Sequence, residues 1–246
     1  MKFLFLKLNL LKVLVAFKFL AYHIRRNCLM KGSINVEKEL EIQKAKYIND
    51  RSYIALTVMA QNQQQKYIEL LTEKDAEVAN KEMADKLINE YLPSIENILG
   101  VLTPMQEEAA TFTGDLQKLH KAALRLAYIL RVRFGTLLDF IAGEEEDGAK
   151  VNALLGQTFY DFHNTVLEFN NLYALIVKGE GTYNLNLESV ALIQNGMTYW
   201  EISDVLRMPC NVNSGDTYYW TDETQNLTLV VNFDDEGEAC HVHCNQ

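Results

Sequence analysis

The sequence predicts an α+β protein, in which an antiparallel four-helix bundle is followed by a small helix-plus-antiparallel-sheet domain. Three observations predict this class. Apolar side chains recur at three- and four-residue steps from about residue 36 to residue 177, the period of helices that bury one face. Only three prolines and twelve glycines occur in 246 residues, so long helices are expected. After Gly181 the composition shifts to Asn, Thr, Tyr and Val, and strand patterns begin.

These patterns divide the chain into a leader at 1–32, the bundle at 33–180 and the small domain at 181–246. The leader is mostly Leu, Phe and Val from Phe3 to Ile24, which is long enough to span a bilayer. Three lysines interrupt this apolar stretch: Lys7, Lys12 and Lys18. Each is costly inside hydrocarbon unless its ammonium group reaches the interface. We therefore expect membrane association through residues 3–24.

The end of the leader does not fit a cleaved signal peptide. Such a peptide has small residues before its cleavage site, but this chain has Arg25, Arg26 and Asn27 there. Cys28 therefore lacks the preceding small residues that are typical of a lipid-modified cysteine. Three interpretations stay open: a degenerate export signal or anchor, an interfacial basic helix, or translated leader upstream of a true start at Met30. We favour an envelope-directed segment.

Charge is distributed unevenly along the chain. The net charge is −10, but residues 1–32 carry seven Lys or Arg and no acid. The remainder therefore has 16 basic against 33 acidic residues, a net charge of −17. A body this acidic repels phosphates, so nucleic acid is not an expected partner.

The two later helices have clear ends. Thr103 and Gln106 form a capping box around Pro104, which suits the first helical turn because no N–H is needed there. This helix is expected to end at Gly143. Its apolar stripe comprises Leu116, Leu119, Ala123, Leu126, Leu130, Phe134, Leu137 and Ile141. The next helix is expected to end in a left-handed cap at Gly179. Its stripe comprises Leu155, Phe159, Phe162, Val166, Phe169, Tyr173 and Ile176.

The two earlier helices are less regular. One is expected to begin at a cap on Thr72 and to kink or split at Pro93. Its stripe comprises Ala84, Leu87, Tyr91, Ile95, Ile98 and Leu102. In the first helix the expected core positions are Tyr47, Ile54, Val58 and Ile68. In that register Gln61 and Gln65 lie close to the expected buried face of the helix.

The small domain begins with a short helix. Thr198 is its expected cap, and Glu201, three residues later, completes a capping box. Pro209 is its expected end. Three strands are expected after it, at 216–222, 226–233 and 239–244.

This domain resembles a known family. The residues that carry the likeness are Gly196-Met197-Thr198, Glu201, the DVL of 204–206, Pro209, the YYW of 218–220, and Phe233 before an Asp/Gly turn. Together they resemble the SmpA/OmlA (BamE-like) lipoprotein domain and the related repeat of the beta-lactamase-inhibitory-protein-like fold, across about residues 187–243. The resemblance implies a small module that acts through protein contacts in the bacterial envelope. Where the family usually has Gly at the helix end, this chain has Arg207-Met208, so we expect the helix to end differently.

By this resemblance the module binds another protein through the face or edge of its sheet. Five aromatic residues are the expected contacts: Tyr199, Trp200, Tyr218, Tyr219 and Trp220. Tyr and Trp supply much of the energy of protein interfaces. The alternative is that these rings form the module's own core, because both uses need large amphipathic side chains.

The last strand carries two cysteines and two histidines: Cys240, His241, His243 and Cys244. Alternation puts the cysteines and Val242 on one face and the histidines on the other. The cysteines are then about 13 Å apart at strand spacing, beyond disulfide reach, and the four side chains cannot share one zinc ion. A disulfide from Cys210 to Cys240 or Cys244 stays open.

Two arguments disagree about which face of this strand is buried. Hydrophobicity buries the face with Val242, whereas the family resemblance buries Ala239 and with it the two histidines. We favour the first, because unpaired buried histidines are costly. No metal site is assigned: an exposed His241 and His243 supply only two of the ligands that zinc needs. A metal-responsive binder stays a third hypothesis.

Signatures of catalysis are missing from the sequence. It has no Gly-rich phosphate loop, no G-x-S-x-G elbow and no Cys–His pairing with a third member. The expected function is therefore that of a non-catalytic, envelope-associated bacterial protein, without a cofactor, that binds another protein. The alternative is a cytoplasmic acidic inhibitor or immunity-type protein starting at Met30.

Overall fold

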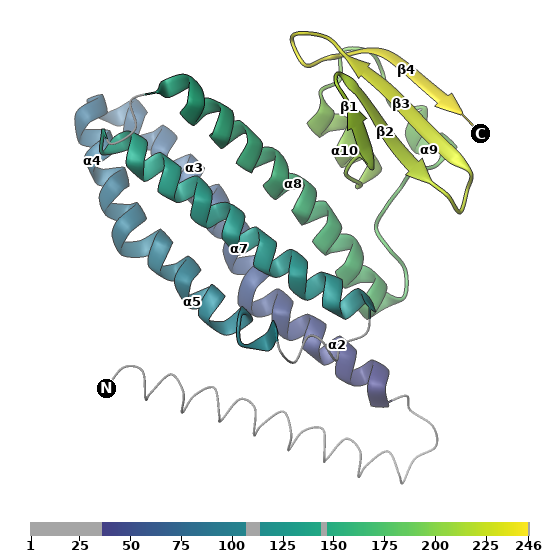
Figure 1. The fold of residues 1–246 in the computed structure, drawn as a ribbon, viewed down its shortest axis with the longest axis horizontal. Coiled ribbons are helices and arrows are strands. Elements are labelled where there is room, and N and C mark those ends of the chain that lie inside the picture. The colour runs from purple at the N-terminus through teal and green to yellow at the C-terminus, as the bar shows by residue number, and fades with distance from the viewer. Residues whose placement is uncertain (1–35, 107–113, 144–146, 246) are drawn as a thin grey trace.

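The computed structural model describes residues 36–106, 114–143 and 147–245, with the helices first and the sheet last (Figure 1). The predicted α+β order is confirmed, since several helices precede a small antiparallel sheet of four strands. The predicted leader at 1–32 lies outside the described residues. Within the described ranges, no helix has the length and apolar character needed to cross a membrane.

The first helical run contains a π-helical turn. Its parts are α2 (Val36–Ile48), η1 (Asn49–Tyr53) and α3 (Ile54–Glu73). At η1 the N–H of Ile54 donates to the carbonyl of Asn49, five residues back. The turn therefore holds one residue more than an α-helical turn. Because the flanking backbone stays in the right-handed helical region, the run continues through η1.

The second helical run is built the same way. Its parts are α4 (Ala76–Lys86), η2 (Leu87–Tyr91) and α5 (Leu92–Leu102). Here the N–H of Leu92 donates to the carbonyl of Leu87. Pro93 lies in the first turn of α5 and has no N–H for a helical hydrogen bond. The irregularity predicted at Pro93 thus takes the form of a π-helical turn just before it.

Two predictions about α3 are wrong. Its buried residues are Leu56, Gln63 and Leu70. Three of the predicted core positions are about half exposed instead: Ile54, Val58 and Ile68. The helix carries two apolar stripes, and its packing against α4 and α7 decides which one is buried. Thr72 is not a cap either, because its hydroxyl donates to the Ile68 carbonyl within α3 and Asp75 is the N-cap of α4.

The two longest helices lie side by side (Figure 1). They are α7 (Gly114–Ile141) and α8 (Gly148–Lys178). Gly143 and Gly179 both adopt positive φ just past the helix ends, and the left-handed cap predicted at Gly179 is confirmed. At the start of α8 the Asp147 side chain accepts hydrogen bonds from two backbone N–H groups. The predicted helix start at Thr103–Gln106 directly precedes residues 107–113, which lie outside the described chain.

The core of the helical part is built around α7, which contacts α2, α3, α4, α5 and α8. Phe134 of α7 and Phe169 of α8 are its largest fully buried side chains. The Phe169 ring stacks on Tyr53, with centroids 4.3 Å apart and planes within 5°. Burial of this apolar surface is the main stabilising contribution to the helical part.

The C-terminal module contains two short helices and four strands. They are α9 (Leu187–Val190), α10 (Tyr199–Leu206), β1 (Val212–Ser214), β2 (Thr217–Asp222), β3 (Leu227–Phe233) and β4 (Ala239–Asn245). The strands pair in chain order, all antiparallel. The three predicted strands and the capping box of Thr198 and Glu201 are confirmed. The sequence analysis missed α9 and β1.

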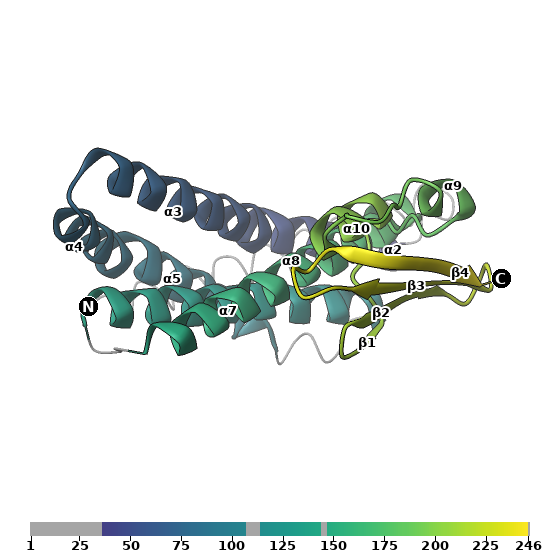
Figure 2. The ribbon, with the colours of Figure 1, turned by 90° about the horizontal axis from the view of Figure 1, so that it is seen from above.

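One face of the sheet packs on α10 to form the core of the module. Figure 2 shows α9 and α10 on one side of the sheet. Ile202 and Leu206 of α10 belong to one buried cluster with Trp220 of β2 and Leu229 of β3. We call this side the inner face of the sheet and the opposite side the outer face.

A bulge in β4 reconciles the two arguments about its buried face. Phe233 pairs with Ala239 and Asn232 with His241, so Cys240 is the extra residue. Ala239 is buried before the bulge, and Val242 and Cys244 pack on the core after it. The prediction that Cys240 points inward is therefore wrong. The histidines lie on the outer face.

The end of α10 also differs from the prediction. Arg207 adopts φ 50° and ψ 31°, the left-handed region in which glycine is favoured. The Met208 N–H donates to the Ser203 carbonyl and the Arg207 N–H to the Asp204 carbonyl, which is the pattern of a Schellman motif. The helix thus ends in a left-handed cap, although the residue at that position is Arg and not Gly.

Replacing Arg207 by glycine is expected to raise the free energy of unfolding by about 1 kcal/mol, since the side chain is exposed and only backbone strain changes. Urea denaturation of the two proteins measures the difference. Asn226→Gly is the control: Asn226 also has positive φ, but Asn tolerates this conformation better, so its gain should be smaller. A loss of stability in Arg207→Gly would contradict the strained cap.

Candidate functional site

The five predicted aromatic residues lie in different environments. Tyr199 and Trp220 are buried in the core of the module. Tyr218 is on the inner face, where its ring packs edge-on against Phe233. Trp200 contacts α8. Only Tyr219 lies on the outer face of the sheet, so it alone of the five is directed away from the module's own core.

The rings of α10 hold the module against α8. The Tyr199 hydroxyl donates to Asn164 Oδ1 at 2.7 Å. The Trp200 ring packs edge-on against Phe159 and His163, with centroid distances of 5.0 and 5.2 Å. The hydroxyl oxygen of Tyr160, on α8, lies 3.4 Å from the Cys210 sulfur. Burial raises the pKa of Tyr160. These contacts use aromatic surface that the sequence analysis assigned to a partner.

The segment that joins α8 to the module is also fixed. Asn171 Oδ1 accepts hydrogen bonds from the N–H groups of Thr182 and Tyr183, at 2.8 and 3.3 Å. A side chain at Gly181 would collide with the same amide. A larger residue at 181 would have to displace the Asn171 amide, which holds the segment through these two hydrogen bonds.

The outer face of the sheet is free of charged side chains. Strand register puts the following residues on it: Val212, Ser214, Thr217, Tyr219, Thr221, Thr228, Val230, Asn232, His241, His243 and Asn245. None of these residues is Asp, Glu, Lys or Arg, and none is buried. The residues after position 32 carry a net charge of −17. A sheet face without Asp, Glu, Lys or Arg therefore differs from the acidic composition of the rest of the chain.

The predicted metal and disulfide residues are separated. His241 and His243 are two residues apart on the outer face, and the described chain has no group of three or more side chains able to hold a metal ion. Cys210 and Cys240 are free thiols. Cys210 precedes β1 and Cys240 lies in β4, at opposite edges of the four-stranded sheet. Three strand spacings, about 14 Å, separate those edges, so the predicted pairing is not compatible with this fold.

A cavity of about 350 Å³ lies between α3, α7 and α8. We call it the α3–α8 groove. Its apolar lining residues are Tyr53, Ala60, Leu130, Phe159, Phe162 and Val166. Its polar lining residues are Thr57, Gln61, Gln64, Arg133 and His163. The volume lies in the range of small-ligand sites, and the lining offers both apolar surface and polar groups to a ligand.

Arg133 is the only Lys or Arg among the described residues that line the groove. Its Nη1 donates to the Leu155 carbonyl at 2.8 Å, and the guanidinium carbon lies 5.9 Å from the centre of the Phe159 ring. Burial lowers the pKa of Arg133, since the charged form is partly removed from water. Among the described residues no carboxylate pairs with it.

His163 lines the groove close to Trp200. Burial lowers its pKa, and the carboxylate of Asp204 raises it by a smaller amount. Asp204 Oδ1 is 3.5 Å from His163 Nε2, and the buried Nε2 has no hydrogen-bond partner. Since burial has the larger effect, the pKa of His163 lies below that of a free histidine.

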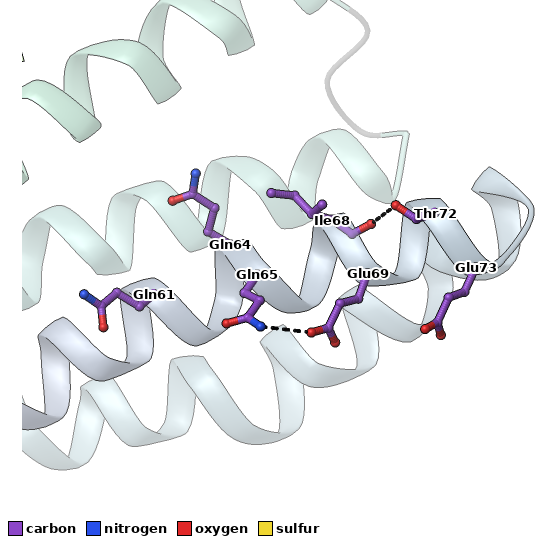
Figure 3. Close-up of a pocket in the computed structure, with 7 residues that line it drawn as sticks. All are labelled: Gln61, Gln64, Gln65, Ile68, Glu69, Thr72 and Glu73. Carbon is purple, nitrogen blue, oxygen red and sulfur yellow. Dashed lines mark hydrogen bonds between the residues drawn. The ribbon is translucent and has the colours of Figure 1, made fainter.

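A second cavity lies on the outer side of α3 (Figure 3). All of its lining residues come from this one helix: Gln61, Gln64, Gln65, Ile68, Glu69, Thr72 and Glu73. Gln65 Nε2 donates to Glu69 Oε1 at 3.2 Å, so these two polar groups satisfy each other. The surface of a single helix does not enclose a ligand, and we assign no site to it.

Sequence reasoning did not find the α3–α8 groove. Phe159 was assigned to the apolar stripe of the bundle, and His163 was not singled out as a site residue. The one signal was Arg133 itself: it lies three residues after Leu130 and four before Leu137, at the edge of an otherwise apolar stripe. Comparison with protein-family models, with curated proteins and with solved structures found no match to this chain. The resemblance to the SmpA/OmlA domain therefore rests on the motif residues alone.

Proposed function

We propose that this chain is a non-catalytic, envelope-associated bacterial protein whose C-terminal module binds another protein through the outer face of its sheet. The observation that carries the proposal is the uncharged outer face on an acidic chain. Depletion of charged residues is typical of the core of protein interfaces. The motif resemblance to BamE-like domains points to the same mode of action.

In this proposal the helical part is an antiparallel four-helix bundle that supports the module. Each π-containing run counts as one helix, and α7 and α8 are the other two. The supporting bundle comprises residues 33–180, and the module that binds the partner comprises residues 181–246. Of the predicted contact residues, Tyr219 keeps its role. The other four support that surface from within the module or from its junction with α8.

The centre of the docking surface is a row of four residues across the sheet. They are Val212, Tyr219, Val230 and His243. Tyr219 is half-buried among neighbours that are small or β-branched, so its ring is the largest side chain on the face. A partner that covers this row gains apolar contact without desolvating a charged group.

The envelope location rests on the leader, with membrane association through residues 3–24. The second candidate, a cytoplasmic inhibitor or immunity-type protein starting at Met30, is favoured by the acidic charge of the body. N-terminal sequencing combined with cell fractionation separates the two. A cytosolic protein beginning at Met30 would contradict the envelope proposal.

Photocrosslinking in living cells tests the docking surface. A photoreactive phenylalanine derivative at position 219 should give a discrete crosslinked protein. The same residue at position 128 should not, since Tyr128 is exposed on α7, away from the sheet. Adding Val230→Glu should abolish the band at 219, because it puts a charge in the middle of the face.

Crosslinks of equal strength from positions 128 and 219 would show nonspecific contact. The absence of any product from 219 would also contradict the docking surface. The Val230→Glu protein needs an unchanged far-UV circular dichroism spectrum for the comparison to count, since Val230 is half-buried in β3.

A further inference from the structure

We propose that the α3–α8 groove binds a small carboxylic acid with an apolar body, and that Arg133 pairs with the carboxylate. This inference goes beyond the proposed protein-binding function and does not depend on it. It rests on the helical part of the chain, whereas the docking surface lies on the module.

The first argument is that Arg133 has no acidic partner among the described residues, in a chain rich in acids. Two other arginines of α7 each have one: Arg125 with Asp161 at 3.8 Å, and Arg131 with Glu96 at 2.7 Å. Arg133 lies deeper, and among the described residues it reaches only a carbonyl and a ring face. A guanidinium has five N–H donors, so most of its hydrogen-bonding capacity is available to a ligand.

The second argument concerns the shape of the groove. The apolar residues Leu130, Phe162 and Val166 lie along it, and Phe159 lies under the guanidinium. A ligand with an apolar body can bury that body on these side chains while its anionic head meets Arg133. Gln61 and Gln64, at the α3 side, can donate further hydrogen bonds to the head group.

The third argument identifies the anion as a single carboxylate. The guanidinium fork matches the two oxygens of a carboxylate in a bidentate pair. A phosphate monoester carries nearly two negative charges, and among the described lining residues Arg133 is the only Lys or Arg. The surrounding acidic body would further disfavour a dianion. Residues 1–32 contain no acid, so no side chain of the leader can supply the carboxylate.

The position of Trp200 provides a direct readout. The chain has two tryptophans, and Trp220 is fully buried in the module. Trp200 packs on Phe159 and His163, both of which line the groove. Occupation of the groove should therefore change the fluorescence of Trp200. A Trp220→Phe background isolates that signal.

The test titrates the full chain with decanoate, below its micellar concentration, by calorimetry and by Trp200 fluorescence. Arg133→Gln should weaken decanoate binding by about 10- to 100-fold, the range for losing a hydrogen bond to a charged group. Arg131→Gln is the matched control on the same helix and should leave binding unchanged. Decan-1-ol should bind the wild type more weakly than decanoate, and Arg133→Gln should not alter its affinity.

A second variant guards against loss of folding in Arg133→Gln. Ala60→Phe adds a ring to the groove lining from α3 and keeps Arg133, so it should also abolish binding. Circular dichroism confirms the fold of each variant. Wild-type protein that does not bind decanoate would overturn the proposal. So would an equal loss in Arg131→Gln, or an affinity for decan-1-ol as high as that for decanoate.

Discussion

Trp220→Ala is expected to lower the free energy of unfolding of the module by about 3–5 kcal/mol. Trp220 is fully buried and is the largest such side chain in the described chain. Its Nε1 donates to the Met208 carbonyl at 3.0 Å, and its ring stacks near Tyr199 with centroids 5.7 Å apart. Truncation leaves a cavity and also leaves that buried carbonyl without its donor. Urea denaturation followed by near-UV circular dichroism measures the loss.

Two control variants separate the contributions at this position. Trp220→Phe keeps a ring but loses the hydrogen bond, and should cost about 1–3 kcal/mol. Tyr219→Ala removes a neighbouring ring from the outer face and should cost about 1 kcal/mol or less, because no core cavity forms. If Trp220→Ala cost no more than Tyr219→Ala, the assignment of Trp220 to the core would be wrong.

Phe169→Ala is expected to cost about 3–5 kcal/mol in the helical part. Phe169 is fully buried on α8, and its ring is stacked on Tyr53, next to the π-helical turn of the first run. Removing it opens a cavity between α8 and η1 and also loses the ring–ring contact. Far-UV circular dichroism during urea denaturation reports this loss, because most of the helix lies in this part.

Phe140→Ala is the matched control for Phe169→Ala. Phe140 is the same residue type on the neighbouring helix α7, but 42% of its surface is exposed. Its removal should change stability by about 0.5 kcal/mol or less, as is usual for surface sites. Equal losses in the two variants would contradict the packing of α7 against α8 around Phe169.

Two of the helix ends were predictable because local chemistry fixes them. The capping box of Thr198 and Glu201 and the glycine after α8 act within a few residues, whatever the rest of the chain does. The buried face of α3 was not predictable. Its two apolar stripes have similar hydrophobicity, and the choice between them depends on packing against helices far along the chain. The bulge at Cys240 is likewise invisible to simple alternation.

The candidate sites also combine features that the local sequence indicates with features that depend on tertiary packing. The sequence indicated a module rich in Tyr and Trp, but it could not tell which rings face its own core. Trp200 shows why, since its partner Phe159 is 41 positions away on α8 and was assigned to the bundle core. The α3–α8 groove needs three helices to be assembled before Arg133, Gln64 and His163 become neighbours. No local pattern encodes that proximity.

The π-helical turns set the rotational phase of the two earlier runs. Because the turn at Asn49–Tyr53 absorbs one residue more than an α-helical turn, deleting one residue there would leave a regular helix in which α2 and α3 keep their relative orientation. Ala45 and Ile48, both fully buried, would then stay in the core. A related chain without the extra residue can therefore keep the same buried faces on α2 and α3, with the apolar positions of α2 one residue nearer to those of α3. Pairwise alignments of such chains should show a one-residue gap at this point.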